Sequence, residues 1–182
     1  IGEMLRQMVA HSVKIVFCME RFDVPGTLYV DVDDAQGGAL TARYLLDQGH
    51  RDILYIHHLM RRREEAFLKA AAEGGATVVT VDCDDFNLQN GVDVIRNLIA
   101  RKQRIPRAIA CVSDVIAVGV RDALREAGFP MEDFVITGFD YLSFMPLLER
   151  PFPSVYQPAY EVGRLAVNNL LRAVSGERVS SV

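Results

Sequence analysis

The sequence predicts an α/β fold built on parallel sheets, and two observations support this prediction. Short, almost continuously apolar runs alternate along the chain with helical patterns of about 10 to 15 residues. Strands of a parallel sheet are buried on both faces and are joined by helices, which gives this alternation. Half of the 182 residues are hydrophobic and 24% are charged, which is enough apolar material for a packed core and argues against a disordered chain.

In the first half of the chain, a local sequence pattern predicts each helix and strand. Apolar residues on one stripe predict a helix, β-branched or continuously apolar runs predict strands, and glycines such as Gly49 and the Gly74-Gly75 pair end helices. The predicted elements are a helix over residues 3–11, strands over 14–19 and 28–32, a helix from Asp33 or Asp34 to residue 46, a strand over 52–56, a helix over 63–73 with residues 66, 67 and 70 inward, and a strand over 77–81.

The second half continues the same alternation. The predicted elements are a helix over residues 90–102, a strand over 108–112, a helix over 114–127 ended by Gly128, a strand over 134–137, a brief strand at 155–156 and a helix over 160–174 ended by Ser175-Gly176. We find no internal repeat and no low-complexity linker.

Composition narrows the class of protein. The formal net charge is −4 and the basic residues form no long block, so the sequence predicts no basic patch that would bind DNA phosphates. Cys18, Cys83 and Cys111 are far apart and odd in number, which predicts buried free thiols in a reducing cytosol. No apolar run reaches the about 18 residues that a membrane span needs. Residue 1 is Ile, so we expect a fragment of a longer protein.

Ligands of open parallel sheets bind beyond the carboxyl ends of the strands. The residues at these places are residues 19–20, 57–58, 113–114 and 139–141. The turns that contain Ser113 and Asp140 are therefore expected to meet at one rim of a sheet. This shared rim is the geometric basis of the predicted site.

Three segments together resemble the effector-binding domains of bacterial transcription regulators of the LacI/GalR type. The first segment is 33–38 (DDAQGG), followed by Gly49-His50-Arg51 and the strand 53–56. The second is Val112-Ser113-Asp114 with Gly128-Phe129-Pro130. The third is 135–140 (VITGFD) with 154–158 (SVYQP). The resemblance covers nearly the whole chain. It implies a type I periplasmic-binding-protein-like fold, in which two Rossmann-like parallel-sheet lobes are joined by crossover strands.

The resemblance also implies a domain organisation. Residues 1–48 would end an incomplete amino-terminal lobe, residues 49–156 would form the carboxyl-terminal lobe, and residues 157–182 would form a return helix and the start of a crossover. A sugar-like effector would bind in the cleft between lobes and control operator DNA binding by a helix-turn-helix headpiece that these residues do not include. The family implies a cytoplasmic homodimer that contacts no membrane, with no cofactor, no metal and no catalytic residue.

Carried onto this sequence, the family pattern implies several ligand-binding residues. A carboxylate at Asp140 accepts hydrogen bonds from neighbouring hydroxyls, and Arg63 clamps vicinal oxygens with its planar fork, unless it belongs to a solvated basic run with Arg61 and Arg62. Ser113 takes the place of a common asparagine and keeps one hydroxyl for a ligand. For Asp114, by contrast, a helix-capping role is expected.

Three further positions complete the implied site. Gln157 falls at a predicted crossover, Tyr141 replaces a common acidic or amide residue, and Met19 stands near a usual ligand-facing aspartate. The departures at Tyr141 and Met19, together with Lys14 in place of a usual proline, leave an aromatic or less hydroxylated effector as an alternative to a sugar.

Particular residues bear on other possible functions. A periplasmic solute-binding protein of a sugar transporter would share the fold, and only upstream sequence would separate it from a regulator. Asp31 and Asp33 resemble the paired aspartates of haloacid-dehalogenase-like phosphatases, but no suitably placed threonine follows. His57 and His58 are adjacent strand residues that point to opposite faces, and residues 82–85 lack the glycine and glutamate of a calcium loop, so neither predicts a metal site.

Overall fold

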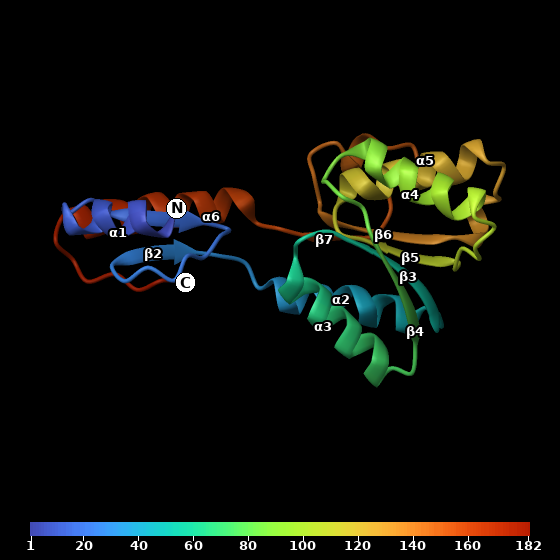
Figure 1. Ribbon diagram of the computed structural model, residues 1–182, viewed down its shortest axis with the longest axis horizontal. Helices are drawn as coiled ribbons and strands as arrows, with labels where there is room; N and C mark the ends of the chain where they lie inside the picture. Colours follow the sequence, from blue (N-terminus) through green and yellow to red (C-terminus); the bar gives the residue numbers. More distant parts are fainter. The chain divides into compact units, whose positions relative to one another are not determined.

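The computed structural model describes all 182 residues, and the chain divides into two units (Figure 1). The first unit comprises Ile1–Asp33 and Pro158–Val182, and the second comprises Asp34–Gln157. We expected the first boundary after residue 48, whereas the structure places it after Asp33. The reason is that helix α2 (Asp34–Asp47) packs against helix α3 and buries Ala42 and Leu45 in the core of the second unit.

The first unit contains a parallel two-stranded sheet and two helices. Its elements are α1 (Gly2–Ala10), β1 (Ile15–Cys18), β2 (Thr27–Val30) and α6 (Ala159–Val174). Val30, Val162 and Ala166 form its small buried core, because α6 packs on both strands. The backbone of Val182 adds hydrogen bonds to the other side of β2, at Tyr29 and Asp31.

The second unit has three layers, with one parallel sheet between two pairs of helices (Figure 1). The strand order is β4-β3-β5-β6-β7, and the bounds are β3 (Asp52–His57), β4 (Thr77–Asp82), β5 (Ala108–Cys111), β6 (Val135–Asp140) and β7 (Ser154–Tyr156). Helices α2 and α3 (Arg61–Glu73) cover one face, and α4 (Leu88–Ala100) and α5 (Asp114–Glu126) cover the other. The predicted α/β class and every predicted helix and strand are confirmed; short 3-10 helices at Met131–Asp133 and Met145–Leu147 were not predicted.

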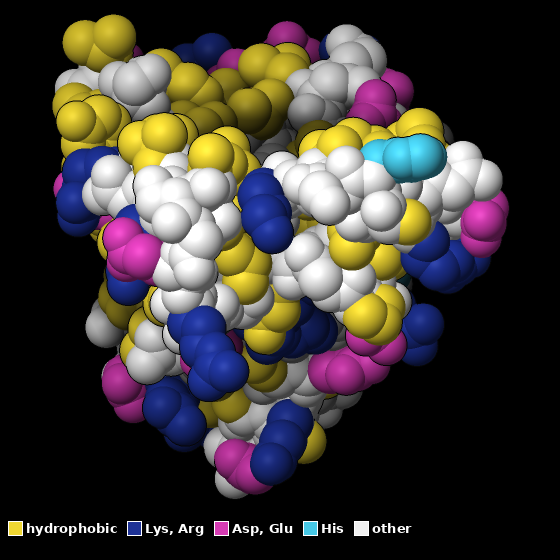
Figure 2. Space-filling view, turned by 90° about the vertical axis from the view of Figure 1, so that its left-hand side faces the viewer, with side chains coloured by type: hydrophobic (Ala, Val, Ile, Leu, Met, Phe, Trp, Pro, Cys, Tyr) yellow, Lys and Arg dark blue, Asp and Glu magenta, His cyan; other side chains and the backbone are white.

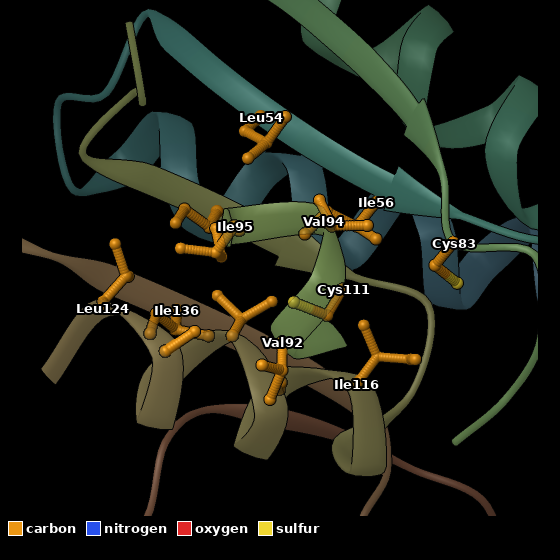
Figure 3. Close-up of a cluster of buried hydrophobic side chains, with 14 of the residues drawn as sticks. Leu54, Ile56, Cys83, Val92, Val94, Ile95, Cys111, Ile116, Leu124 and Ile136 are labelled. Carbon is orange, nitrogen blue, oxygen red and sulfur yellow. The ribbon is translucent and has the colours of Figure 1, made fainter. Parts of the chain in front are cut away.

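Side chains of the central strands alternate between two cores. Leu54 and Ile56 of β3 pack with α4 and α5, as Figure 3 shows, while Ile53 and Tyr55 of the same strand pack with α2 and α3. A strand buried on both faces needs apolar residues at every position. This explains why the runs at 53–56 and 108–112 show no polar alternation.

The cysteines are all free, but they differ in exposure. Cys83 and Cys111 are buried, and burial raises the pKa of the Cys83 thiol to about 11 and that of Cys111 well above its usual value. Cys18 is exposed at the end of β1, so the prediction that it is buried was wrong. The strand ends there, and its last side chain finds no covering element.

The exposed surface mixes residue types. On the face drawn in Figure 2, Lys and Arg side chains are scattered among acidic and hydrophobic ones and form no continuous basic strip. Several large apolar side chains of the first unit are exposed, including Ile1, Met4 and Val174. None of the helices combines the length and the apolar character required to cross a bilayer.

The close approach of α2 to α3 depends on Gly38. A Cβ atom at this position would collide with the backbone carbonyl of Arg63. Both atoms belong to regular helices, so relief requires the two helices to move apart. We expect Gly38→Ala to lower the free energy of unfolding by about 2 kcal/mol, because overpacking of a fixed interface outweighs the gain in helix propensity.

Urea unfolding followed by circular dichroism measures this effect, and Gly163→Ala is the matched control. Gly163 lies in α6, where an added Cβ atom meets nothing within 4 Å. Alanine there should be neutral or stabilising by up to about 1 kcal/mol. Equal effects of the two substitutions would show that the α2–α3 contact does not require glycine.

Candidate functional site

The predicted rim exists at the carboxyl edge of the sheet in the second unit. Strands β5 and β6 are parallel neighbours, with Ala110 paired to Thr137. Ser113 lies two residues after the end of β5 and Asp140 ends β6, so both lie at the same edge, as expected. Five of the six predicted residues belong to this unit, and Met19 belongs to the first.

Arg63 is a buried charge at this rim and is only 5% exposed. Its Nε and Nη2 atoms donate to one carboxylate oxygen of Asp34 at 3.1 and 2.7 Å, and Nη1 donates to the carbonyl oxygen of Val112 at 2.6 Å. The guanidinium carbon lies 3.3 Å from the centre of the Phe139 ring. The alternative of a solvated basic run is therefore wrong for Arg63, whereas its neighbours Arg61 and Arg62 are exposed.

The position of Arg63 follows from helix geometry. The buried residues of α3 are Arg63, Phe67, Ala70 and Ala71, which lie on one stripe at spacings of four, three and one. The arginine is the first residue of this stripe and so points toward the sheet at the rim. Its charge is tolerated there because Asp34 at the start of α2 pairs with it.

Asp140 is half-buried and holds the other charge of the site. One carboxylate oxygen accepts a hydrogen bond from Nε2 of Gln157 at 2.6 Å. Burial raises the pKa of Asp140 to about 6, and nearby negative charges on Asp114 and Asp34 add to the rise, while Arg63 and Gln157 oppose it. The carboxyl group therefore changes charge close to neutral pH.

The backbone around Asp140 is also unusual. Asp140 has φ 98° and Tyr141 has φ 51°, both in the left-handed region that residues other than glycine rarely adopt. Such conformations persist where surrounding contacts impose them, and they cluster at functional sites. Here the Ser154 hydroxyl accepts a hydrogen bond from the Tyr141 N–H at 3.1 Å.

Gln157 offers an acceptor at the same place. It is 9% exposed, and its Oε1 atom is buried without a hydrogen-bond partner within the chain. Its backbone N–H donates to the carbonyl oxygen of Asp140 at 3.3 Å. The carboxylate of Asp140 and the amide oxygen of Gln157 thus give two neighbouring acceptors for hydroxyl donors.

Ser113, and not Asp114, caps helix α5. Ser113 is the N-cap of α5, because its Oγ accepts from the N–H of Ile116 at 3.4 Å. Asp114 was expected to cap this helix, but it is the first residue inside it and is fully buried. Its two oxygens accept from the Ser154 hydroxyl at 2.6 Å and the Leu142 N–H at 2.7 Å, so it anchors the segment that follows β6.

The aromatic and apolar candidates are more exposed. Tyr141 and Tyr156 have ring centres 6.2 Å apart in an edge-to-face arrangement and are 46% and 64% exposed. Met19 follows β1 in the first unit with φ 57°, and it is 40% exposed. Asp34 and Phe139, which fix Arg63, were not predicted as site residues; the spacing of Arg63 from Phe67 was the available signal for a buried arginine.

The histidine pair forms two separate contacts. Nδ1 of His57 lies 3.5 Å from a Glu64 carboxylate oxygen, and Nδ1 of His58 lies 3.0 Å from one of Asp82. The two rings therefore do not share a partner. The structure contains no group of three or more His, Cys, Asp or Glu side chains placed to hold a metal ion.

Comparison with known proteins identifies the family. Residues 42–181 match the model of the periplasmic binding protein-like domain. The chain belongs to this family. Among curated relatives, the periplasmic binding protein-like chain is 32% identical over 154 residues to the transcriptional repressor PurR of Erwinia tasmaniensis and 31% identical over 156 residues to that of Pectobacterium atrosepticum. It spans 45% and 46% of their lengths, and they span 80% and 81% of it.

Solved structures agree with this fold. A LacI family regulator from Enterococcus faecium with bound ribose matches 100% of the periplasmic binding protein-like chain and 70% of its own length, with a TM-score of 0.89 and 20% identity. A complex of the regulator CelR with cellobiose matches 96% of the chain and 56% of its own length, with a TM-score of 0.82 and 26% identity. The resemblance to LacI/GalR effector-binding domains is confirmed, and the matched curated relatives are transcriptional regulators rather than enzymes.

Proposed function

We propose that this chain is the effector-sensing part of a bacterial transcription regulator and that it binds a sugar-like small molecule at the rim formed by Asp140, Gln157 and Arg63. One observation carries the proposal: Gln157 Oε1 is a buried acceptor without a partner beside the carboxylate of Asp140. A buried acceptor without a partner costs free energy that a bound hydroxyl group recovers. The amide oxygen of Gln157 and the carboxylate of Asp140, side by side, suit vicinal hydroxyls.

Family membership supports the same conclusion. Similar solved structures hold ribose and cellobiose, and the matched curated relatives are repressors. We therefore favour a regulator over a solute-binding protein of a transporter and over an enzyme. Ligand binding would control operator binding by a headpiece elsewhere in the full-length protein, which we propose to act as a homodimer in the cytoplasm.

Ser113, Tyr141 and Met19 stay candidates for ligand contact. The Ser113 hydroxyl accepts a bond from the helix it caps and can still donate its proton. Tyr141, with Tyr156 beside it, gives an exposed aromatic surface near Asp140, which would suit the face of a sugar or an aromatic effector.

A thermal-shift screen tests whether the chain binds such molecules. Sugars, nucleosides and small organic acids are tested, with ribose, cellobiose and adenosine first. A ligand at a hundred times its Kd stabilises the native state by about 2.7 kcal/mol, which raises the melting temperature by several degrees. A panel without any hit, or a hit that binds equally well to Gln157→Leu and Asp140→Asn, would contradict the proposed site.

The regulatory half of the proposal needs the full-length protein. A ligand shifts a conformational equilibrium only by its difference in affinity for the two states. Operator affinity measured with and without each hit should therefore change. An operator affinity that stays the same with every ligand that binds would show that the domain is not a switch.

A further inference from the structure

The two places where the chain passes between its units lie next to the candidate site residues. The second unit begins at Asp34 and ends at Gln157. The Asp34 side chain pairs with Arg63, and the Gln157 side chain is hydrogen-bonded to Asp140. Each connecting segment therefore ends in a side chain that holds one of the two charged groups of the site.

The contact of Asp34 with Arg63 fixes an orientation as well as a charge. Two N–H groups of the guanidinium converge on one Asp34 oxygen, a third is held by Val112, and the ring of Phe139 covers one face. A guanidinium has five N–H groups. Two of them are thus left for another acceptor, in a direction set by the contact with Asp34.

The contact of Gln157 with Asp140 works in the same way. The side-chain amide donates to the carboxylate at 2.6 Å, and the backbone N–H donates to the Asp140 carbonyl oxygen at 3.3 Å. Two bonds between the same residues tie the end of β6 to the last residue of the unit.

We propose that Asp34 and Gln157 are positioning residues that orient Arg63 and Asp140 for ligand binding. The link to ligand binding rests on the proposed function, whereas the positioning itself is a property of the chain alone. It can therefore be measured with no ligand present.

Titration of the Asp140 carboxyl group reports on both contacts, because loss of each contact shifts the titration midpoint in an opposite direction. The charged groups that influence it are Arg63 from α3, Asp34 from α2 and Asp114 from α5. Replacing Asp34 with Asn removes a negative charge and releases Arg63, so the Asp140 midpoint moves to lower pH. Replacing Gln157 with Leu removes a donor to the carboxylate, so the midpoint moves to higher pH.

Carbon-detected NMR of the Asp140 carboxyl group between pH 4.5 and 8 measures these midpoints. We expect shifts of about half a unit to one unit, downward for Asp34→Asn and upward for Gln157→Leu. The Nε–H signal of Arg63 should exchange with solvent faster in Asp34→Asn, and Asp34→Glu should restore its protection. If Asp34→Asn does not fold, Asp34→Ser replaces it, because serine is also accepted at the start of a helix.

The controls make the same chemical changes at exposed positions. The control variants are Asp47→Asn and Gln48→Leu. Asp47 is the last residue of α2 and Gln48 follows it, and both are exposed. Midpoint shifts no larger than in these controls, or shifts of the same sign in both variants, would overturn the positioning roles of Asp34 and Gln157.

Titrations with ribose and cellobiose on the same samples test the link to binding. Asp34→Asn should weaken binding about tenfold or more, because it releases Arg63 from its charge-assisted hydrogen bonds, and Asp34→Glu should restore binding. Gln157→Leu also removes a proposed ligand acceptor, so its loss of binding tests the site itself. Failure of every ligand in the panel would reject the proposed function, and the pH midpoints would still decide the positioning roles. Binding that Asp34→Asn leaves unchanged would overturn the link to ligand binding.

Discussion

Replacing Arg63 with alanine is expected to lower the free energy of unfolding by about 3 to 5 kcal/mol, because it leaves buried partners without their opposite charge. Asp34 would lose both of its bonds from the guanidinium, and the Val112 carbonyl oxygen would lose its donor. Three carboxylates near the rim, those of Asp34, Asp114 and Asp140, would then have no cation among them. Ligand binding should be lost together with stability.

Urea unfolding at pH 7.5 measures the effect, with Arg61→Ala as the control from the same helical turn. Arg61 is exposed, and its removal should change the free energy by no more than about 0.5 kcal/mol. Arg63→Lys should recover part of the loss, since lysine keeps the charge but not the planar fork. A loss in Arg63→Ala no larger than in Arg61→Ala would show that the buried network does not support the fold.

Replacing Asp140 with asparagine should stabilise the chain at pH 8 and weaken ligand binding. The folded-state pKa of about 6 lies above the unfolded value, so the native state holds its proton more tightly. Stability contributed by this group is therefore present at low pH and is lost as pH rises through the window from about 4 to about 6. A difference of about two pKa units corresponds to at most about 3 kcal/mol, which partial exposure of the carboxyl group reduces to about 1 to 2 kcal/mol.

Two pH series check this prediction. The stability advantage of Asp140→Asn should be largest above about pH 6 and fade as pH falls to about 4. For a sugar that donates to the carboxylate, affinity of the unchanged chain should fall below about pH 6, whereas Asp140→Asn should bind about 10 to 100 times more weakly and without this pH dependence. A stability difference that does not vary with pH would contradict the raised pKa of Asp140.

Much of the fold followed from periodicity. Unbroken apolar runs such as 53–56 and 108–112 predicted strands buried on both faces, and glycines such as Gly49 and Gly128 marked helix ends. The boundary between the two units could not be predicted from periodicity. The apolar face of α2 shows that this helix packs against a core, but not which of the two cores it joins. Ala42 and Leu45 decide this, and their partners in α3 are distant in sequence.

The site was predicted less completely than the fold. The placement of Ser113 and Asp140 at one rim follows from parallel neighbouring strands, which the order of elements already indicated. The role of Asp114 was missed, because its partners Ser154 and Leu142 lie 28 to 40 residues away and come close only in the folded chain. The role of Arg63 was ambiguous, because it is one of three consecutive arginines. Only its spacing from Phe67 identifies it as the buried one.

The most direct test of the sensor site is amide NMR mapping of the chain with ribose, cellobiose or another hit of the screen. We predict that the largest ligand-induced shifts within the second unit fall at Ser113, Asp140, Tyr141 and Gln157. A separate cavity of about 410 Å³ lies on the face of the same sheet, lined by residues that include Leu40, Tyr44 and Thr137 and by none of these four. Shifts confined to Leu40, Tyr44 and Thr137, with the rim residues unchanged, would contradict the assignment of the ligand site.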